Sequence, residues 1–193
     1  MKSLKTIIFV LITSLSLTGC AGLFIAGAAT TAAIVIDPRT TQEIWNDNNI
    51  EFEVAGIANK EPVRGNARVT ASSYEGTVVL MGQANDAALS EQIEQKAREV
   101  KGVKTVYNQI RIKAPLSAGE VSHDSWITTK VKSAILTDSE LSGIKIKVIT
   151  EDKEVFLLGY VSPQHADKAT DIARNISGVK QVIRAFQIAE SNE

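Results

Sequence analysis

Hydrophobic positions in the second half of the chain change their spacing in a fixed order, which predicts a small folded unit. A helical stripe comes first, with Asp124 expected to cap the helix and a buried side formed by Ile127, Val131, Ala134 and Ile135. Residues 144–148 alternate apolar and lysine positions, and residues 155–161 form a more apolar strand. Ser162 and Pro163 open a second helix that stops before Gly178, and residues 179–188 form a last strand. The predicted order is αββαβ.

The same order occurs twice, because the sequence VVLMG at 78–82 recurs 77 positions later as VFLLG at 155–159. The offset also matches Asp47 with Asp124 and Ile50 with Ile127. Each copy has about 67 residues, near the lower size limit for a domain that folds alone. The second helix of the first copy has its own apolar side, formed by Leu89, Ile93, Ala97 and Val100.

This order of elements predicts an α+β fold for each copy. The first two strands can form a hairpin. The second strand, the second helix and the third strand should form a right-handed crossover, which makes the second and third strands parallel neighbours. The result is a three-stranded mixed sheet with both helices on one face. We place the domains at 45–113 and 123–190, and the linker between them, at 114–122, is short enough to leave the copies in contact.

The N-terminus has the layout of a secretory signal, with Lys2 and Lys5 before an apolar run at 7–17 that is too short to span a bilayer. The run ends in Leu-Thr-Gly-Cys, which resembles the bacterial lipobox. The resemblance implies cleavage after residue 19 and acylation of Cys20, for example with palmitate. Ala21 at the next position favours sorting to the outer membrane. Residues 20–44 form an apolar tether near the bilayer, with a transmembrane helix at 21–36 as the alternative.

Composition argues against several functional classes. The chain has 21 basic and 22 acidic residues, and loss of the signal leaves a net charge of −3, which disfavours a nucleic-acid binder. The single cysteine excludes an intramolecular disulfide framework and a multi-cysteine zinc site, and two histidines leave little for a histidine-based metal centre. His123 and His165 lack a partner at motif spacing, and we interpret both as exposed polar residues. We predict no catalytic residues, no metal, no cofactor and no enzymatic activity.

An apolar strand ending in glycine, an alanine-rich helix and then Gly-Val-Lys-x-Val resembles the BON domain, present here twice. One departure is 151–153 (EDK), where the family prefers a glycine in the turn and the first copy has Gly76. The resemblance, together with the lipobox, implies an outer-membrane lipoprotein that faces the periplasm and maintains envelope integrity. It also implies association with division sites and binding of anionic phospholipids, phosphatidylglycerol and cardiolipin, through the second domain.

The first helix of the second copy carries a candidate phospholipid-binding surface. Its outward residues are Trp126, Lys130, Lys132, Ser133, Leu136 and Thr137. A tryptophan beside lysines suits the headgroup layer, and each lysine adds about 1 kcal/mol of attraction to anionic lipid. The matching helix has Glu51, Glu53 and Asn49 and no lysine, so we expect it to be repelled. The alternative is that Trp126 packs on the other domain or the linker and Leu136 on a neighbouring strand.

Two other functions compete with lipid binding. The runner-up is a periplasmic adaptor that binds an outer-membrane protein partner, such as the β-barrel assembly machinery. A cytolytic factor is a third class, suggested only by haemolysin labels on some relatives. No long amphipathic pore-forming segment supports it.

Overall fold

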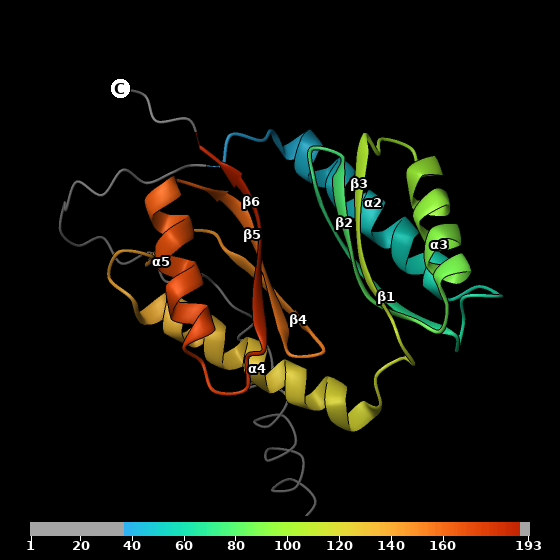
Figure 1. Cartoon of the computed structure of the whole chain (residues 1–193). Coiled ribbons are helices and arrows are strands. Elements are labelled where there is room, and N and C mark those ends of the chain that lie inside the picture. The colour runs from blue at the N-terminus through green and yellow to red at the C-terminus, as the bar shows by residue number, and fades with distance from the viewer. Residues whose placement is uncertain (1–36, 190–193) are drawn as a thin grey trace, which may run out of the picture. The chain divides into compact units, whose positions relative to one another are not determined.

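The computed structural model describes residues 37–189 (Figure 1). The expected signal peptide, Cys20 and the tether up to residue 36 lie outside the described residues. The order αββαβ occurs twice, as predicted. The first copy contains α2 (Thr41–Ala58), β1 (Ala67–Tyr74), β2 (Thr77–Ala84), α3 (Ala87–Glu99) and β3 (Thr105–Ile112). The second contains α4 (Ala118–Thr137), β4 (Lys147–Glu151), β5 (Glu154–Val161), α5 (Pro163–Arg174) and β6 (Gln181–Ile188).

Each copy forms its own three-stranded mixed sheet, with strand orders β1-β2-β3 and β4-β5-β6. The first two strands pair antiparallel and the last two pair parallel in both sheets, which confirms the expected hairpin and parallel neighbour. Figure 1 shows α2 and α3 against one face of the first sheet, with α4 and α5 in the same relation to the second. The predicted apolar sides of α3 and α4 are buried on these faces, apart from Ala134, which is half-buried.

Several boundaries differ from the sequence-based expectation. The helix α2 begins at Thr41, inside the stretch expected to be tether, because Thr40 and Glu43 form a capping box. Similarly, α4 begins at Ala118 behind a Ser117–Glu120 capping box, so only 114–117 lack regular structure. A strand was expected at 144–148, but the corresponding strand β4 lies three residues further along the chain and pairs with β5 over residues 147–151. In each case a local cap or pairing outweighed the hydrophobic pattern.

The repeated glycine at the end of the apolar strand is required by a close approach of two backbones. A Cβ added at Gly82 would lie 2.0 Å from the Arg68 carbonyl oxygen, and one at Gly159 would lie 2.5 Å from that of Lys145. Both glycines have φ values, 133° and 146°, that other residues rarely adopt. The glycine in the BON-like motif therefore lets the hairpin partner cross closely at this point.

A buried aspartate links the first helix of each copy to its hairpin turn. Asp47 is 2% exposed, and its carboxylate accepts hydrogen bonds from the backbone N–H groups of Glu75 and Gly76 at 2.8 and 2.9 Å. In the second copy, the Asp124 carboxylate accepts hydrogen bonds from the backbone N–H groups of Asp152 and Lys153 at 2.7 and 3.0 Å. Asp124 lies inside α4, so its predicted role as a helix cap is wrong.

These aspartates explain why the second copy does not need a glycine in its turn. All four turn residues have positive φ, including Asp152 at 53° and Lys153 at 63°. A two-residue hairpin of this handedness favours glycine, and a residue with a side chain incurs strain there. The two hydrogen bonds to Asp124 offset that strain. The departure from the BON pattern at 151–153 therefore leaves the turn geometry unchanged.

The two sheets contact each other through the faces opposite to their helices. Every second residue of the central strands faces the helices. These residues are Val78 and Leu80 in β2, and Val155 and Leu157 in β5. The residues that alternate with them point to the opposite face, where they form a separate cluster between the two copies. This cluster contains Val79, Met81, Phe156 and Leu158. Both faces of these central strands are thus buried, which accounts for their uninterrupted apolar sequence. The expected contact between the copies is present.

Ion pairs surround this apolar contact. Glu151 and Glu154 are 4% and 5% exposed, and each binds an arginine of the first copy: Arg68 at 3.3 Å and Arg111 at 2.7 Å. Acids are common in turns as solvated surface residues, but these two are buried and paired with arginines of the first copy. Further contacts join the copies, namely Lys113–Asp152, Lys147–Glu51 and the stacked rings of Tyr74 and Tyr160.

The glycine requirement predicts opposite effects for two alanine substitutions. Gly82→Ala should lower the free energy of unfolding by roughly 3 kcal/mol, because the new Cβ meets the Arg68 carbonyl in strained backbone. Gly56→Ala in α2 meets nothing within 4 Å and should stabilise the protein by about 0.5–1 kcal/mol. Urea unfolding of protein that begins at residue 21, without the expected signal peptide and acylated cysteine, measures both values. Equal effects of the two substitutions would contradict this account.

The Asp47 contacts predict a pH-dependent contribution to stability. Burial raises the pKa of Asp47, but hydrogen bonds from Ser73, Gly76, Glu75 and Arg39 outweigh burial and bring it below its ordinary value of 3.8. A lowered carboxyl pKa stabilises the fold above that ordinary value, and the contribution is lost as the pH falls through the folded-state pKa. Asp47→Asn should therefore cost on the order of 1–3 kcal/mol at pH 7 and less at pH 3, which lies below the ordinary carboxyl pKa.

Urea unfolding at the two pH values tests this prediction. Asp171→Asn is the control, because that side chain is 57% exposed and pairs only with Arg174 on its own helix. A cost of Asp47→Asn that is the same at both pH values would show that its charge does not stabilise the turn.

Candidate functional site

The candidate surface is the outward face of α4. The helix is oriented by its buried stripe, in which Asp124, Ile127, Val131 and Ile135 are at most 5% exposed. Asp124 binds the hairpin turn and the three apolar residues pack on the sheet, so the rotation of the helix is determined. The residues on the other side must then face outward.

The two large apolar side chains of this face are exposed. Trp126 is 61% exposed and Leu136 is 67% exposed. The alternative in which Trp126 packs on the other domain and Leu136 on a neighbouring strand is therefore wrong for the described structure. Ser133 and Thr137 are also exposed, and so is Lys132. The structure thus places these five predicted residues on the surface of one helix.

The lysines of this face differ from one another. Lys130 is half-buried, and its ammonium donates a hydrogen bond to the Ser177 carbonyl, just before β6. Lys132 extends into solvent. Among the described residues, ion pairs are formed by other lysines, such as Lys147 with Glu51 and Lys168 with Glu140. The positive charges of Lys130 and Lys132 are therefore not neutralised by a neighbouring carboxylate of the described chain.

Two threonine hydroxyls near the apolar residues are already hydrogen-bonded to the helix backbone. The Thr137 hydroxyl donates to the Ser133 carbonyl at 3.0 Å, and that of Thr129 donates to the Ser125 carbonyl at 2.9 Å. Removing water from a hydroxyl that is already hydrogen-bonded costs less than removing it from a free one. These two threonines therefore add little to the cost of moving the face into a less polar environment.

A groove runs beside the C-terminal end of α4. Its volume is about 620 Å³, and it is lined by residues of both copies, with Leu136 and Lys145 on the second copy and Asp37 and Tyr74 on the first. Lys145 and Lys147, which alternate with the apolar residues at 144–148, have different environments. Lys145 is exposed, but Lys147 is bound to Glu51 of α2 at 2.8 Å and belongs to the contact between the copies.

Comparisons with known proteins agree with the two-copy architecture. The family model of the BON domain matches residues 46–114 and 123–190. The chain belongs to the BON-domain family. It is 38% identical over 188 residues, 97% of either chain, to the outer membrane lipoprotein DolP of Haemophilus influenzae. A 21 kDa hemolysin of Actinobacillus pleuropneumoniae is 39% identical over 156 residues, 80% of either chain. The osmotically-inducible protein Y of Escherichia coli is 26% identical over 192 residues, 94% of either chain.

The first BON domain has an exposed aromatic surface that the sequence analysis missed. Trp45 is 63% exposed and Phe52 is 80% exposed, on the α2 face that corresponds to the Trp126 face of α4. Both BON domains therefore present large apolar groups on this helix. The periodicity of α2 alone could have revealed both residues, because its buried positions Asp47, Ile50 and Val54 leave them on the outside.

Charge distinguishes the two helices. The α2 helix contains Glu43, Glu51 and Glu53 and no lysine or arginine, whereas α4 contains Lys130 and Lys132. Glu51 is occupied by hydrogen bonds with Ser72, Ser73 and Lys147, which leaves Glu53 as an exposed acid of α2. The expected difference in charge between the twin helices is present.

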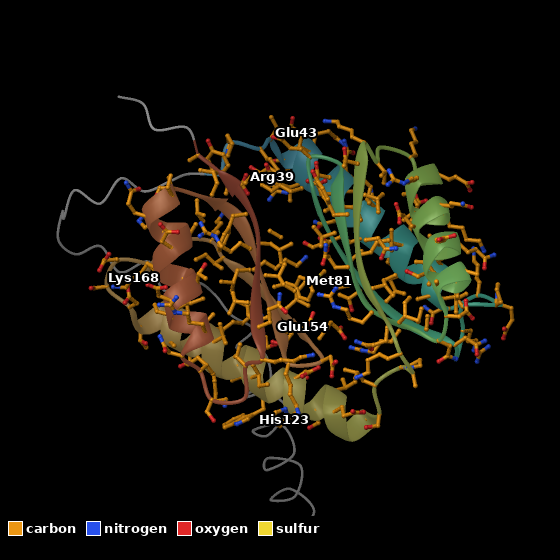
Figure 2. The ribbon with its side chains drawn as sticks, in the orientation of Figure 1. Arg39, Glu43, Met81, His123, Glu154 and Lys168 are labelled. Atoms are coloured by element: carbon orange, nitrogen blue, oxygen red, sulfur yellow. The ribbon has the colours of Figure 1, made fainter. Side chains whose placement is uncertain are left out.

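The histidines lie in different environments. His123 is exposed on α4 (Figure 2), whereas His165 is half-buried in the first turn of α5, with its Nδ1 atom buried. The expectation of an exposed side chain is thus wrong for His165. Within residues 37–189 no three His, Cys, Asp or Glu side chains are arranged to hold a metal ion. In the same range no helix has the length and apolarity needed to cross a membrane.

Proposed function

We propose that this chain is a lipoprotein of the outer membrane, acylated at Cys20 and facing the periplasm, that supports envelope integrity and binds anionic phospholipids through α4. It acts by binding and not by catalysis. The similarity to DolP, named an outer membrane lipoprotein, extends over 97% of the chain and supports the location. Association with division sites is part of the same proposal and rests on the family resemblance.

One observation carries the lipid-binding part of the proposal. Trp126 and Leu136 are more than half exposed on the helix that also presents Lys130 and Lys132 without carboxylate partners in the described chain. An indole prefers the headgroup layer because one edge is polar and the rest is apolar. Lysines next to it are attracted to a negative bilayer surface. Phosphatidylglycerol and cardiolipin supply that negative charge.

Acylation and α4 would have separate roles. A lipid anchor keeps the protein at the bilayer regardless of headgroup charge, since affinity depends on the buried methylene groups. The α4 face adds a weaker contact that depends on anionic lipid and on salt. Together they would hold the second BON domain against the membrane in a defined orientation.

Vesicle binding by soluble protein that begins at residue 21 tests the proposal. The protein should bind vesicles of phosphatidylglycerol and cardiolipin and should not bind vesicles of phosphatidylcholine alone. Trp126→Glu should reduce the binding at least about tenfold, because it replaces the interfacial indole by a repelled acid. Trp45→Glu is the matched control, since Trp45 is equally exposed on the twin helix, and it should retain binding.

Two results would discard the α4 face as the lipid-binding surface. One is wild-type binding by the Trp126→Glu protein, and the other is an equal loss in the Trp45→Glu protein. Crosslinking from position 126 in cells separates lipid binding from the adaptor function. Lipid as the dominant product supports the proposal, whereas one outer-membrane protein as the dominant product supports the adaptor.

A further inference from the structure

The groove between the two BON domains lies where the described chain begins. Its volume of about 620 Å³ is within the range of roughly 300–1,000 Å³ that is typical of binding pockets. Its apolar lining includes Ile44, Val79, Leu136, Ile144, Ile146 and Leu158. Asp37, the first described residue, lines the same groove. The segment that precedes Asp37 must therefore start at the groove.

Arg39 holds this starting point in place. Its guanidinium donates to the Asp37 carboxylate from Nε at 3.0 Å and from Nη2 at 2.7 Å, and to the buried Asp47 from Nη1 at 2.8 Å. The guanidinium also lies 4.0 Å from the centre of the Tyr74 ring, which stacks on Tyr160 of the second domain. Figure 2 shows Arg39 beside the start of α2. The chain thus leaves Asp37 from a fixed point next to both domains.

The segment before Asp37 is apolar. Residues 32–36 read AAIVI and carry no charge, and they lie outside the described residues. Three residues of extended chain span about 10 Å, so residues 34–36 cannot lie far from the groove. Burying their side chains against an apolar lining removes them from water. Because the segment is covalently attached beside the groove, its effective concentration there is high.

The charged side chains of the groove do not oppose an apolar occupant. Arg39 is paired with both aspartates, and Lys147 is paired with Glu51 at 2.8 Å. Covering these groups therefore leaves none of them without its partner, which is the costly case for a buried charge. Lys145 is exposed, and its long side chain can keep the ammonium in water.

We propose that residues 34–36 of the tether dock in the groove between the two BON domains. The 14 residues from 20 to 33 can still span about 45 Å when extended, which leaves the acylated end free to reach the bilayer. Leu136 at the end of α4 lines the groove, so the docked tether leaves the folded part beside the lipid-binding helix. Docking does not itself require lipid binding by α4, so it goes beyond the proposed function.

Disulfide formation in the full-length lipidated chain, in isolated envelopes, tests this inference. Ile34→Cys combined with Lys145→Cys places one thiol on the segment and one at the groove. Oxidation should join these thiols within one chain, and mass spectrometry of the linked peptides identifies which positions are joined. Adding Ile36→Ser should slow the joining roughly tenfold, because a hydroxyl replaces a buried apolar side chain.

Two matched controls separate docking from mere proximity. Gln42 is exposed on the first turn of α2, five residues after Asp37, and it is not among the residues that line the groove. Ile34→Cys with Gln42→Cys should therefore join much more slowly than the pair at the groove. Ile25→Ser is the control for Ile36→Ser, because it changes the same residue type elsewhere in the tether, and it should leave the rate unchanged.

The docking inference and lipid binding by α4 can fail separately. Trp126 does not line the groove, so Trp126→Glu should leave the rate of disulfide formation unchanged. Loss of vesicle binding with an unchanged disulfide would support both proposals. Loss of the disulfide in a protein that still binds vesicles would contradict docking alone.

Any of three results would overturn the inference: equal rates at positions 42 and 145, no effect of Ile36→Ser, or an equal effect of Ile25→Ser. Other occupants are tested by a benzophenone maleimide attached to the Lys145→Cys chain with its tether otherwise unchanged. Its main crosslink should be to residues 33–36. A phospholipid or a different protein as the main product would contradict docking and would identify the occupant of the groove.

Discussion

The contact between the two sheets is the constraint on which the rest of the structure depends. Each sheet packs its helices on one face and the other BON domain on the opposite face, where Met81 and Phe156 are almost completely buried. Both faces of the central strands β2 and β5 are thus removed from solvent, and the ion pairs of Glu151 and Glu154 surround the contact. The outward sides of α2 and α4 then carry most of the large apolar side chains that are exposed in the described residues.

Duplication gives this protein two versions of one outward helix face. The buried aspartate that binds the hairpin turn sets the rotation of α2 and α4 alike, so corresponding positions point outward in both domains. Both faces carry an exposed tryptophan, and charge is what differs between them. A cationic face can approach an anionic bilayer, whereas a neutral face beside an acid is better suited to a protein surface. Two related helices can therefore serve different partners.

Most of the fold could be predicted from local patterns in the sequence, because the change from helical to alternating spacing marks each element. The role of Asp124 could not be predicted, since a helix cap and a ligand of a distant turn look identical in a sequence. The partners of Glu151 and Glu154 lie 83 and 43 positions away, so no local pattern reveals them. Trp126 and Leu136 could be predicted to face outward, because the apolar stripe of α4 places them on the opposite side of the helix. Trp45 and Phe52 follow from the same rule, because the buried positions Asp47, Ile50 and Val54 place both on the outward side of α2.

The central claim is that charge directs the face of α4, and not that of α2, to anionic lipid. The chain has two tryptophans, one on each face, so tryptophan fluorescence can follow each face separately. In Trp45→Phe protein, emission from Trp126 should shift to shorter wavelength when cardiolipin vesicles are added, as the indole leaves water. In Trp126→Phe protein, emission from Trp45 should stay unchanged. A shift of Trp45 with no shift of Trp126 would contradict the account.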